Sequence, residues 1–332
     1  DWNKISENKF KTSNLEILKE IDGTEFITAL TLLVSYINYR DVKQGYVGCK
    51  RENILNSAPT DYLQYKDALA DGFIEAVKFL EEEGITKIKY LPYKPQLIPM
   101  AALLAELKIS GKNNAASRDK FRQWYWCGVF GEAYRDGHLS RFAKDIVQVM
   151  EWIETNEEPE IIKDTQIVAS ALIRVKSIQS AIFKGIISMI FRNKATDFRS
   201  GRAMALSANH GESIDVHHIF PKKYCDNRNF QPTVYDSILN KTPISSETNK
   251  IIGREAPSIY IKEFERQGNS PRQIDDSFAS HFIDAALCRA DDFDAFVVDR
   301  AKKILDAIEN LTGLKVVGRD SPEIKKLFDT TI

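Results

Sequence analysis

The chain has 332 residues, of which 46 are Lys or Arg and 47 are Asp or Glu, so its formal net charge at pH 7 is -1. This balance excludes the uniformly basic surface of a protein that coats nucleic acid, and any basic footprint has to be local. With 43% hydrophobic residues, a chain of this length is expected to form two packed units rather than one.

The cysteines and the apolar segments limit the class of protein. Four cysteines, without a CxxC pair and without the dense spacing of a secreted disulfide framework, lie at positions 49, 127, 225 and 288. We therefore expect reduced thiols and no structural zinc. No apolar run approaches the roughly 20 residues of a membrane helix, and no signal peptide pattern opens the chain. These features predict a cytoplasmic protein without a membrane partner. Because the chain starts with Asp1 rather than Met, we expect an excised piece of a longer protein.

The first half of the chain has the spacing of helices. Apolar residues between 26 and 37, and again between 73 and 80, recur at intervals of three and four, which is typical of one helix face. The aromatic run 124–126 could stack on nucleic-acid bases, but its helical context favours a packed face. An acidic segment at 154–160, with Pro159 and no apolar residue, marks the junction to the second half. We therefore expect a helical domain over 1–155.

The second half, 156–332, combines helices with two short strands. An apolar helix is expected over 178–191, and further helices are expected from Ser245 and over 291–311. The segments 213–218 and 242–244 are short and are placed so that they can pair as strands. The chain as a whole is thus expected to be mainly α. It should form a helical bundle followed by a helix-rich domain with a small ββα core at about 213–254.

Basic residues gather in one window of this second domain. Residues 192–254 contain ten Lys or Arg against six Asp or Glu, so the window carries +4 and the remainder -5. Such a basic island is what binding to a phosphate backbone requires, since neutralised phosphates release counterions. A solvated face with a chance bias is the alternative. The same two interpretations apply to the individual candidates for phosphate contact, Lys222, Lys223, Lys250 and Arg254.

A histidine pair lies near the centre of this window. His217 and His218 are followed by an apolar residue, a variable position and Pro221. Adjacent strand residues point to opposite faces, and Pro221 both ends the strand and fixes the turn. If the strand bends there, one imidazole can bind a metal ion while its neighbour faces the substrate. For two histidines alone, a hydrogen-bonded structural pair is the simpler alternative.

Two asparagines follow at an interval of nine residues. Asn249 lies one turn into the helix expected after the second strand, where it can converge with His217 on one divalent cation. Asn240 precedes the second strand and can hydrogen-bond the imidazole or the backbone of the His218 segment. Asp215 lies two residues before His217, on the same strand face. It is either an outer partner that holds an imidazole tautomer or a plain strand-edge residue.

These residue types suit the hydrolysis of a phosphodiester. That reaction needs an activated water, neutralisation of charge in the transition state and help for the leaving 3′ oxygen. A hard cation such as Mg²⁺, held by two protein ligands and otherwise by water and phosphate oxygens, can supply two of these. His218, neutral near pH 7, would take the proton from the attacking water.

The arrangement resembles the HNH, or ββα-metal, nucleases, whose pattern is (Asp/His)-His-(Ile/Val)-x-Pro followed by Asn and by Asn or His nine residues on. The resemblance implies a DNA endonuclease in which His218 is the general base and Asn240 orients the loop. It implies that His217 and Asn249 bind one divalent cation, Mg²⁺ before others. His217 lies where many relatives have Asp, which leaves Mn²⁺ and Ni²⁺ open.

Longer segments resemble GmrSD-type modification-dependent restriction enzymes. AIFKGIISMIFRNKATDFRSG and NKIIGREAPSIYI look like the nuclease half of that family, and KIKYLPYKPQLIPMAALL and DKFRQWYWCGVFGEAYRDG look like its helical region. The resemblance implies restriction of modified, double-stranded DNA in a bacterial cytoplasm, as a defence against phage. The DGQQR motif of the family's N-terminal nucleotide-hydrolysing domain is absent. We therefore expect that domain on a missing segment or subunit.

Three interpretations stay open at this level. The chain cleaves DNA, it cleaves RNA, or it is a regulatory module whose degenerate HNH fold docks DNA or a partner without cutting. One HNH site cuts one strand per event, so double-strand cleavage would need two sites or two visits. A homodimer would meet that need.

Overall fold

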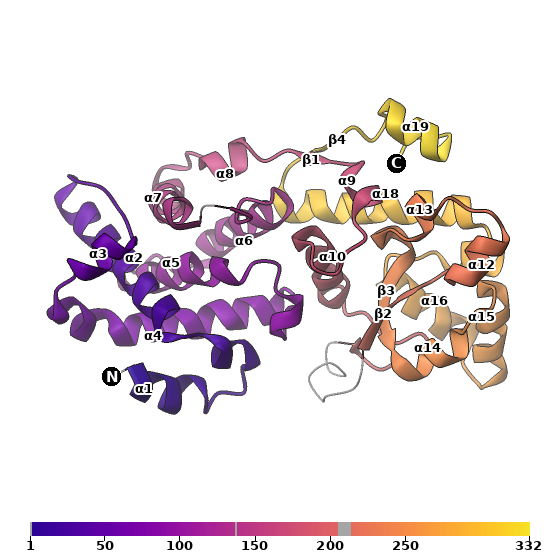
Figure 1. Ribbon diagram of the computed structural model, residues 1–332, viewed down its shortest axis with the longest axis horizontal. Coiled ribbons are helices and arrows are strands. Elements are labelled where there is room, and N and C mark those ends of the chain that lie inside the picture. Colours follow the sequence, from indigo (N-terminus) through magenta and orange to yellow (C-terminus); the bar gives the residue numbers. More distant parts are fainter. Residues whose placement is uncertain (1, 137, 205–213) are drawn as a thin grey trace. The chain divides into compact units, whose positions relative to one another are not determined.

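The computed structural model describes residues 2–136, 138–204 and 214–332 (Figure 1). The prediction of a mainly helical chain is confirmed. The chain forms two compact units, Asp1–Thr165 and Gln166–Ile332, hereafter the helical unit and the C-terminal unit. The boundary between them lies after Thr165, beyond the acidic segment 154–160, whereas the sequence placed it after residue 155, within that segment. The reason is local, because the short helix α8 (Glu160–Lys163) buries two isoleucines and packs against another helix of the helical unit.

A central apolar helix organises the helical unit. The helices of this unit are α1 (Trp2–Ile5), α2 (Gly23–Val42), α3 (Arg51–Leu55), α4 (Pro59–Glu82), α5 (Leu97–Ile109), α6 (Ala115–Phe130), α7 (His138–Thr155) and α8, with shorter π or 3₁₀ turns at Ser6–Phe10, Glu16–Glu20, Ile88–Tyr90 and Lys94–Gln96. Helix α5 is buried from Leu97 to Leu107, as expected of a helix that is apolar all round, and it packs against α2, α4 and α7 (Figure 1). A Cβ at Gly72 of α4 would lie 2.3 Å from the carbonyl oxygen of Ala101, so the close approach of α4 and α5 requires glycine there.

The aromatic run of α6 belongs to this core. Trp124, Tyr125 and Trp126 are all fully buried. The indole nitrogen of Trp126 donates a hydrogen bond to the buried carboxylate of Glu83 at 2.9 Å, and Arg122 pairs with the same carboxylate at 2.6 Å. The expectation of a packed face is confirmed, and these rings are not available to stack on bases.

The C-terminal unit contains helices around two small sheets in its described residues. Its elements are β1 (Ile167–Val168), α9 (Ala171–Arg174), α10 (Ala181–Arg192), β2 (Ile214–His218), α12 (Lys222–Asn227), α13 (Pro232–Tyr235), a 3₁₀ turn (Ile238–Asn240), β3 (Lys241–Ser245), α14 (Ser246–Ile252), α15 (Pro257–Arg266), α16 (Pro271–Ser280), α17 (Ala285–Arg289), α18 (Phe293–Thr312), β4 (Val316–Val317) and α19 (Pro322–Phe328). Strands β1 and β4 pair in parallel, whereas β2 and β3 form an antiparallel pair.

The antiparallel pair and the helix after it form the ββα arrangement that positions the histidines. Ser213, with which the first strand was expected to begin, lies outside the described residues, and β2 runs from Ile214 to His218. The second strand extends beyond the expected 242–244 at both ends. Ser245 then caps α14, because its hydroxyl oxygen accepts a hydrogen bond from the Thr248 amide at 3.1 Å. Helix α14 packs against both strands (Figure 1).

Helix α18 supplies much of the core beneath this arrangement. Phe293 and Phe296 on α18 contact the ring of Phe220, which follows the histidine pair, with ring centroids 5.3 Å and 4.9 Å apart. Arg300, one turn further on, is fully buried.

No helix in the described parts of the chain combines the length and apolarity needed to cross a bilayer.

Candidate active site

The two histidines end strand β2 and lie opposite the start of β3. His217 pairs in register with Thr242, and His218 pairs with Lys241. Both imidazoles are only partly exposed. Their hydrogen bonds differ, so the pair presents two chemically distinct rings within one strand end.

The ring of His217 is held by its own backbone. Its Nδ1 atom lies 3.3 Å from the carbonyl oxygen of His218. A carbonyl only accepts, so Nδ1 carries the proton, and the lone pair of Nε2 is left for another partner. Burial lowers the pKa of His217, which keeps the imidazole neutral near pH 7. A neutral imidazole with Nδ1–H bound to a carbonyl is the usual state of a metal-binding histidine.

Asp215 and Asn249 lie together beside this strand. The Ser246 hydroxyl donates to Oδ2 of Asp215 at 3.0 Å, and the side-chain amide nitrogen of Asn249 lies 3.5 Å from the same oxygen. Asp215 therefore contacts the start of α14, and the tautomer-holding contact of His217 is made by a backbone carbonyl instead. With its nitrogen directed at a carboxylate, Asn249 has its amide oxygen available for a cation.

His218 has a partner in Asp236, a residue that the sequence pattern did not indicate. Nε2 of His218 lies 3.2 Å from Oδ1 of Asp236, and Nζ of Lys241 pairs with the same oxygen at 2.9 Å. Burial is the largest influence on His218 and lowers its pKa; Lys241 lowers it further, and Asp236 opposes both. Asp236 follows helix α13 and lies 18 residues from His218, so no local pattern in the sequence identifies it as the partner.

Asn240 is fully buried and binds backbone, not the imidazole. Its side-chain oxygen accepts from the amide of Phe220, and its side-chain nitrogen donates to the carbonyls of Phe220 and Tyr235, each at 2.9 Å. Of the two options left open by the sequence, the backbone contact is the one found. Asn240 touches no solvent. It therefore positions the turn after His218 and does not contact a substrate.

Further buried groups immobilise the same turn. The hydroxyl of Tyr260 donates to the carbonyl of Ile219 at 3.0 Å, and Cys225 Sγ contacts the carbonyl of Phe220 at 3.4 Å. Arg300 donates to the carbonyls of Leu239 and Lys241 at 2.8 and 2.9 Å, just before and within β3. These contacts hold the turn after His218 and the start of β3 in place.

Asp197 holds the junction between β3 and α14. Its buried carboxylate accepts hydrogen bonds from the Ser245 amide at 2.9 Å and from the Thr248 hydroxyl at 2.7 Å. Although burial alone would raise the pKa of Asp197, hydrogen bonds from Ser200, Thr248 and Ser245 hold it below its ordinary value. The carboxylate is therefore ionised and anchors the helix that carries Asn249.

An open pocket of about 420 Å³ lies at the histidine pair. It is lined by His217, His218, Pro221, Lys222, Lys223, Asp226, Gly253 and Arg254. Three of the four predicted phosphate contacts thus share one pocket with both imidazoles. Lys250 is exposed but does not line it, and neither do Asn249 and Asp215. The pocket combines three cationic side chains with one carboxylate, which suits an anionic ligand.

The residues at and beside the pocket offer few donor atoms for a metal ion. Within the described ranges, no group of three or more His, Cys, Asp or Glu side chains is placed to hold a metal ion. A cation would rely on Nε2 of His217 and the amide oxygen of Asn249, with Asp215 next to the latter. Mg²⁺ tolerates so few protein ligands because it keeps several waters and binds substrate phosphates.

Known proteins similar to this chain do not indicate its activity. No protein-family model matches the chain. An uncharacterized protein of Methanocaldococcus jannaschii is 34% identical over 344 aligned positions, which cover 93% of this chain and 56% of that protein. The chain therefore spans about half the length of this curated relative. The functional assignment has to rest on the geometry of the site.

Proposed function

We propose that the chain is a divalent-metal-dependent endonuclease of the HNH type that hydrolyses DNA phosphodiester bonds. The observation that supports this most is the different state of two adjacent imidazoles at one basic pocket. His217 has its Nδ1 proton on a carbonyl, and His218 has Nε2 on a carboxylate. One ring is prepared to bind a cation and the other to accept a proton.

His218 is the proposed general base. Asp236 accepts a hydrogen bond from Nε2 only when that nitrogen carries the proton, which leaves the lone pair on Nδ1. Because its pKa lies below the ordinary 6.5 of imidazole, His218 is neutral at pH 7 and can take a proton from water. The water oxygen then forms the new bond to phosphorus as the bond to the 3′ oxygen breaks.

His217 and Asn249 are the proposed metal ligands. A hard divalent cation bound there would stabilise the charge on the phosphate oxygens and assist the leaving oxygen. The protein contributes orientation: the His218 carbonyl fixes the ring of His217, and Asp215 orients the amide of Asn249. Mg²⁺ and Mn²⁺ suit the amide oxygen of Asn249, whereas Ni²⁺ suits the imidazole of His217 better.

Lys222, Lys223 and Arg254 are the proposed phosphate contacts. They line the pocket that both imidazoles share, so a phosphate drawn to these cations lies beside the proposed base. Lys250 lies outside the pocket and is left as a secondary contact to the flanking backbone. Asn240 acts indirectly, because its three buried hydrogen bonds hold the turn between His218 and Lys222.

The proposal extends to a role in restriction of modified DNA through the resemblance to GmrSD-type enzymes. Nicks on both strands would need two sites or two visits, and a homodimer, which supplies two sites, is part of this extended proposal. A nucleotide-hydrolysing partner domain or subunit is a further part of it.

The central test is nicking of supercoiled plasmid. Wild type should relax the plasmid in the presence of Mg²⁺ or Mn²⁺, and EDTA should stop the reaction. His218→Ala should lower the rate by about 10² to 10⁴ fold, the contribution of a general base. Equal nicking by wild type and His218→Ala would refute the assignment. A folded wild type that binds plasmid without nicking it would instead support the regulatory module, and cleavage confined to a parallel RNA substrate would redirect the proposal to RNA.

A further inference from the structure

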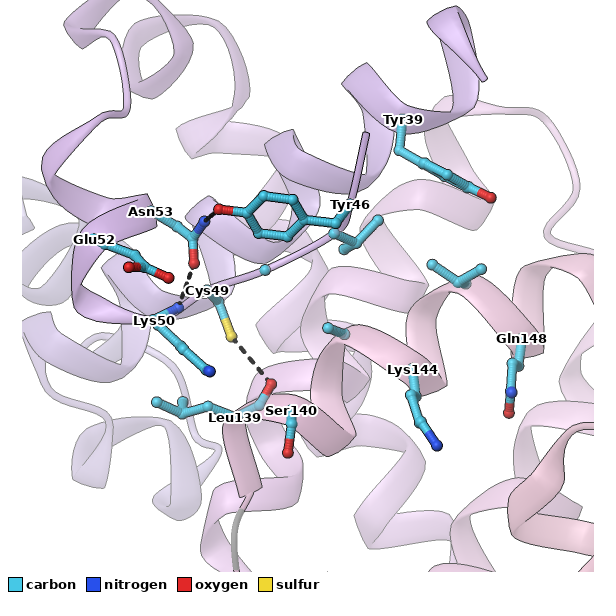
Figure 2. Close-up of a pocket in the computed structure, with 14 residues that line it drawn as sticks. Tyr39, Tyr46, Cys49, Lys50, Glu52, Asn53, Leu139, Ser140, Lys144 and Gln148 are labelled. Atoms are coloured by element: carbon cyan, nitrogen blue, oxygen red, sulfur yellow. Dashed lines mark hydrogen bonds between the residues drawn. The ribbon is translucent and has the colours of Figure 1, made fainter. Parts of the chain in front are cut away.

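A second candidate binding site lies in the helical unit, beside the side chain of Tyr46. A cavity of about 400 Å³ lies between the segment 46–50 with helix α3 on one side and helix α7 on the other (Figure 2). Figure 2 shows Tyr39 of α2 at one end of this space and Lys50 and Lys144 on opposite sides of it. Cys49 Sγ contacts the carbonyl of Leu139 at 3.8 Å, which joins the two walls.

A neighbouring cavity of about 380 Å³ shares part of this lining. Tyr39, Tyr46 and Asn53 line both cavities, so Tyr46 lies where they meet. The second cavity is rich in amides and hydroxyls, with Ser35, Asn38, Gln44, Asn53, Asn56 and Ser57 in its lining. Amide side chains both donate and accept hydrogen bonds, so this lining matches a ligand whose edge carries both kinds of group.

Tyr46 is exposed but held in place. The residue is 70% exposed. Its hydroxyl oxygen accepts a hydrogen bond from the amide nitrogen of Asn53 at 3.2 Å (Figure 2). The amide oxygen of Asn53 in turn accepts from the backbone of Lys50 at 2.9 Å, and the Gly48 amide donates to Ser35 at 3.0 Å. The ring is therefore presented to solvent by an ordered segment.

The charges around the two cavities balance. Lys50 and Lys144 are opposed by Glu52 and Asp61, and Lys144 is already paired with Glu160 at 2.8 Å. A phosphate would need an excess of cations. The lining instead suits a neutral, flat group of a larger ligand, which stacks on tyrosine and hydrogen-bonds at its edge while any attached phosphate stays in solvent.

We propose that the two cavities beside Tyr46 bind unpaired nucleobases of the DNA substrate, stacked against the tyrosine ring. This inference rests on the proposed endonuclease function, which makes DNA the ligand at hand. Aromatic side chains bind unpaired bases of any sequence, and asparagine and glutamine read base edges. A protein partner would favour a continuous apolar surface. Leu55 is the most exposed large apolar residue here, at 74%, yet it lines neither cavity.

The test compares two single-stranded oligonucleotides of equal length, one with bases and one abasic, by fluorescence anisotropy in EDTA. The full chain carrying His218→Ala is used, so that binding is measured without cleavage. It should prefer the oligonucleotide with bases by at least about fivefold, the lower bound for stacking of one base. Adding Tyr46→Ala should remove most of this preference, whereas Tyr46→Phe, which keeps the ring, should retain it.

The controls separate this site from a general apolar surface and from misfolding. Leu55→Ala removes a comparably exposed apolar side chain outside both cavities and should keep the preference. Asn53→Ala should weaken it, and circular dichroism should show each variant folded. The inference is overturned if the parent chain binds both oligonucleotides equally, if folded Tyr46→Ala keeps the preference, or if Leu55→Ala loses it. A Tyr46-dependent dimer in light scattering, without base preference, would assign the surface to a second copy instead. Plasmid nicking by wild type is scored separately, so failure here leaves the nuclease proposal standing.

Discussion

Nε2 of His218 lies 3.2 Å from Oδ1 of Asp236, and Nζ of Lys241 lies 2.9 Å from that same oxygen. One carboxylate thus joins the proposed base to a lysine that is its register partner in the hairpin. The lysine side chain is only 13% exposed, so its charge acts on His218 with little screening by solvent. Removing the carboxylate would free the imidazole to rotate and leave the lysine without its counter-ion.

Asp236→Ala should therefore lower the rate of plasmid nicking by about 10 to 100 fold, the range typical of a residue that orients a functional histidine. The apparent affinity for plasmid should change little, because Asp236 does not line the basic pocket. Asp236→Asn, which keeps an oxygen acceptor, should recover part of the rate. Asp226→Asn is the matched control, because Asp226 lines the pocket but binds Tyr235 rather than His218. An equal loss of rate in both Asn variants would point to pocket charge and not to positioning.

Substitutions of the proposed metal ligands should change the metal requirement of nicking, whereas substitution of the proposed base should change its maximal rate. His217→Ala and Asn249→Ala should raise the concentration of Mg²⁺ or Mn²⁺ needed for half-maximal nicking, because each removes one of the few protein ligands. Asp215→Asn should act in the same direction but less strongly, since Asp215 orients Asn249.

His218→Ala, by contrast, should lower the maximal rate without changing the metal requirement. Rates are to be measured over a metal titration for all four variants. If His217→Ala shows the wild-type metal dependence, His217 is not a ligand.

Asn240 should matter for stability first. Asn240→Ala leaves the amide and carbonyl of Phe220 and the carbonyl of Tyr235 without their buried partner. The Phe220 carbonyl keeps its contact with Cys225 Sγ, whereas each of the other two groups costs about 1 to 3 kcal/mol when unsatisfied, so the free energy of unfolding should fall by about 2 kcal/mol or more. Urea unfolding of Asn249→Ala, a partly exposed position on α14, serves as the comparison and should change by less than about 1 kcal/mol. Unchanged stability in Asn240→Ala would contradict the role given to these hydrogen bonds.

The basic pocket predicts a salt-dependent contribution to DNA binding. Single Ala substitutions of Lys222, Lys223 and Arg254 should each weaken binding and reduce the slope of log Kd against log salt by about one. Lys250→Ala should have a smaller effect, because Lys250 does not line the pocket. Duplex binding in EDTA over a series of salt concentrations measures both quantities. Four equal effects would show that the phosphate path extends beyond the pocket along α14.

His281 predicts how stability depends on pH. Its buried ring accepts from the Thr242 hydroxyl on Nδ1 at 2.6 Å and donates from Nε2 to the Thr196 carbonyl at 2.9 Å, so it is neutral. Burial lowers the pKa of His281 to about 3. The unfolded chain, with an ordinary histidine pKa of about 6.5, binds one more proton between these values. The contribution of neutral His281 to the free energy of unfolding is therefore complete above pH 6.5. It is lost as the pH falls toward 3, by roughly 1.4 kcal/mol per pH unit.

Urea unfolding at pH 7.5 and pH 5 should show this loss in wild type. His281→Gln, which cannot titrate in this range, should show a loss that is smaller by about 2 kcal/mol. The same pH dependence in both proteins would mean that other groups dominate acid unfolding.

Local spacing was enough to identify the elements around the candidate site. The helical periodicity, the hairpin and the serine cap of α14 depend on residues within a few positions of one another, and all three are present. The pair His217-His218 before Pro221 is a local pattern of the same kind. Such features survive in the sequence because backbone geometry repeats at fixed intervals.

The residues that support the site come together only through long-range packing. Asp236 reaches His218 from 18 positions away, Asp197 reaches Ser245 from 48, and Arg300 reaches Lys241 from 59. Packing of helices that are distant in sequence creates these contacts, so no periodic pattern encodes them.

The two basic residues that follow Asn249 also show what the sequence leaves open. Lys250 and Arg254 were equivalent in the sequence, yet only Arg254 lines the pocket. Helix α14 ends at Ile252, and Gly253 adopts a φ of +53°, which redirects the chain and brings Arg254 to the histidines. The residue types available for chemistry can be read from the amino-acid sequence. Only the folded backbone determined which of them face one another, because that depends on where each helix stops.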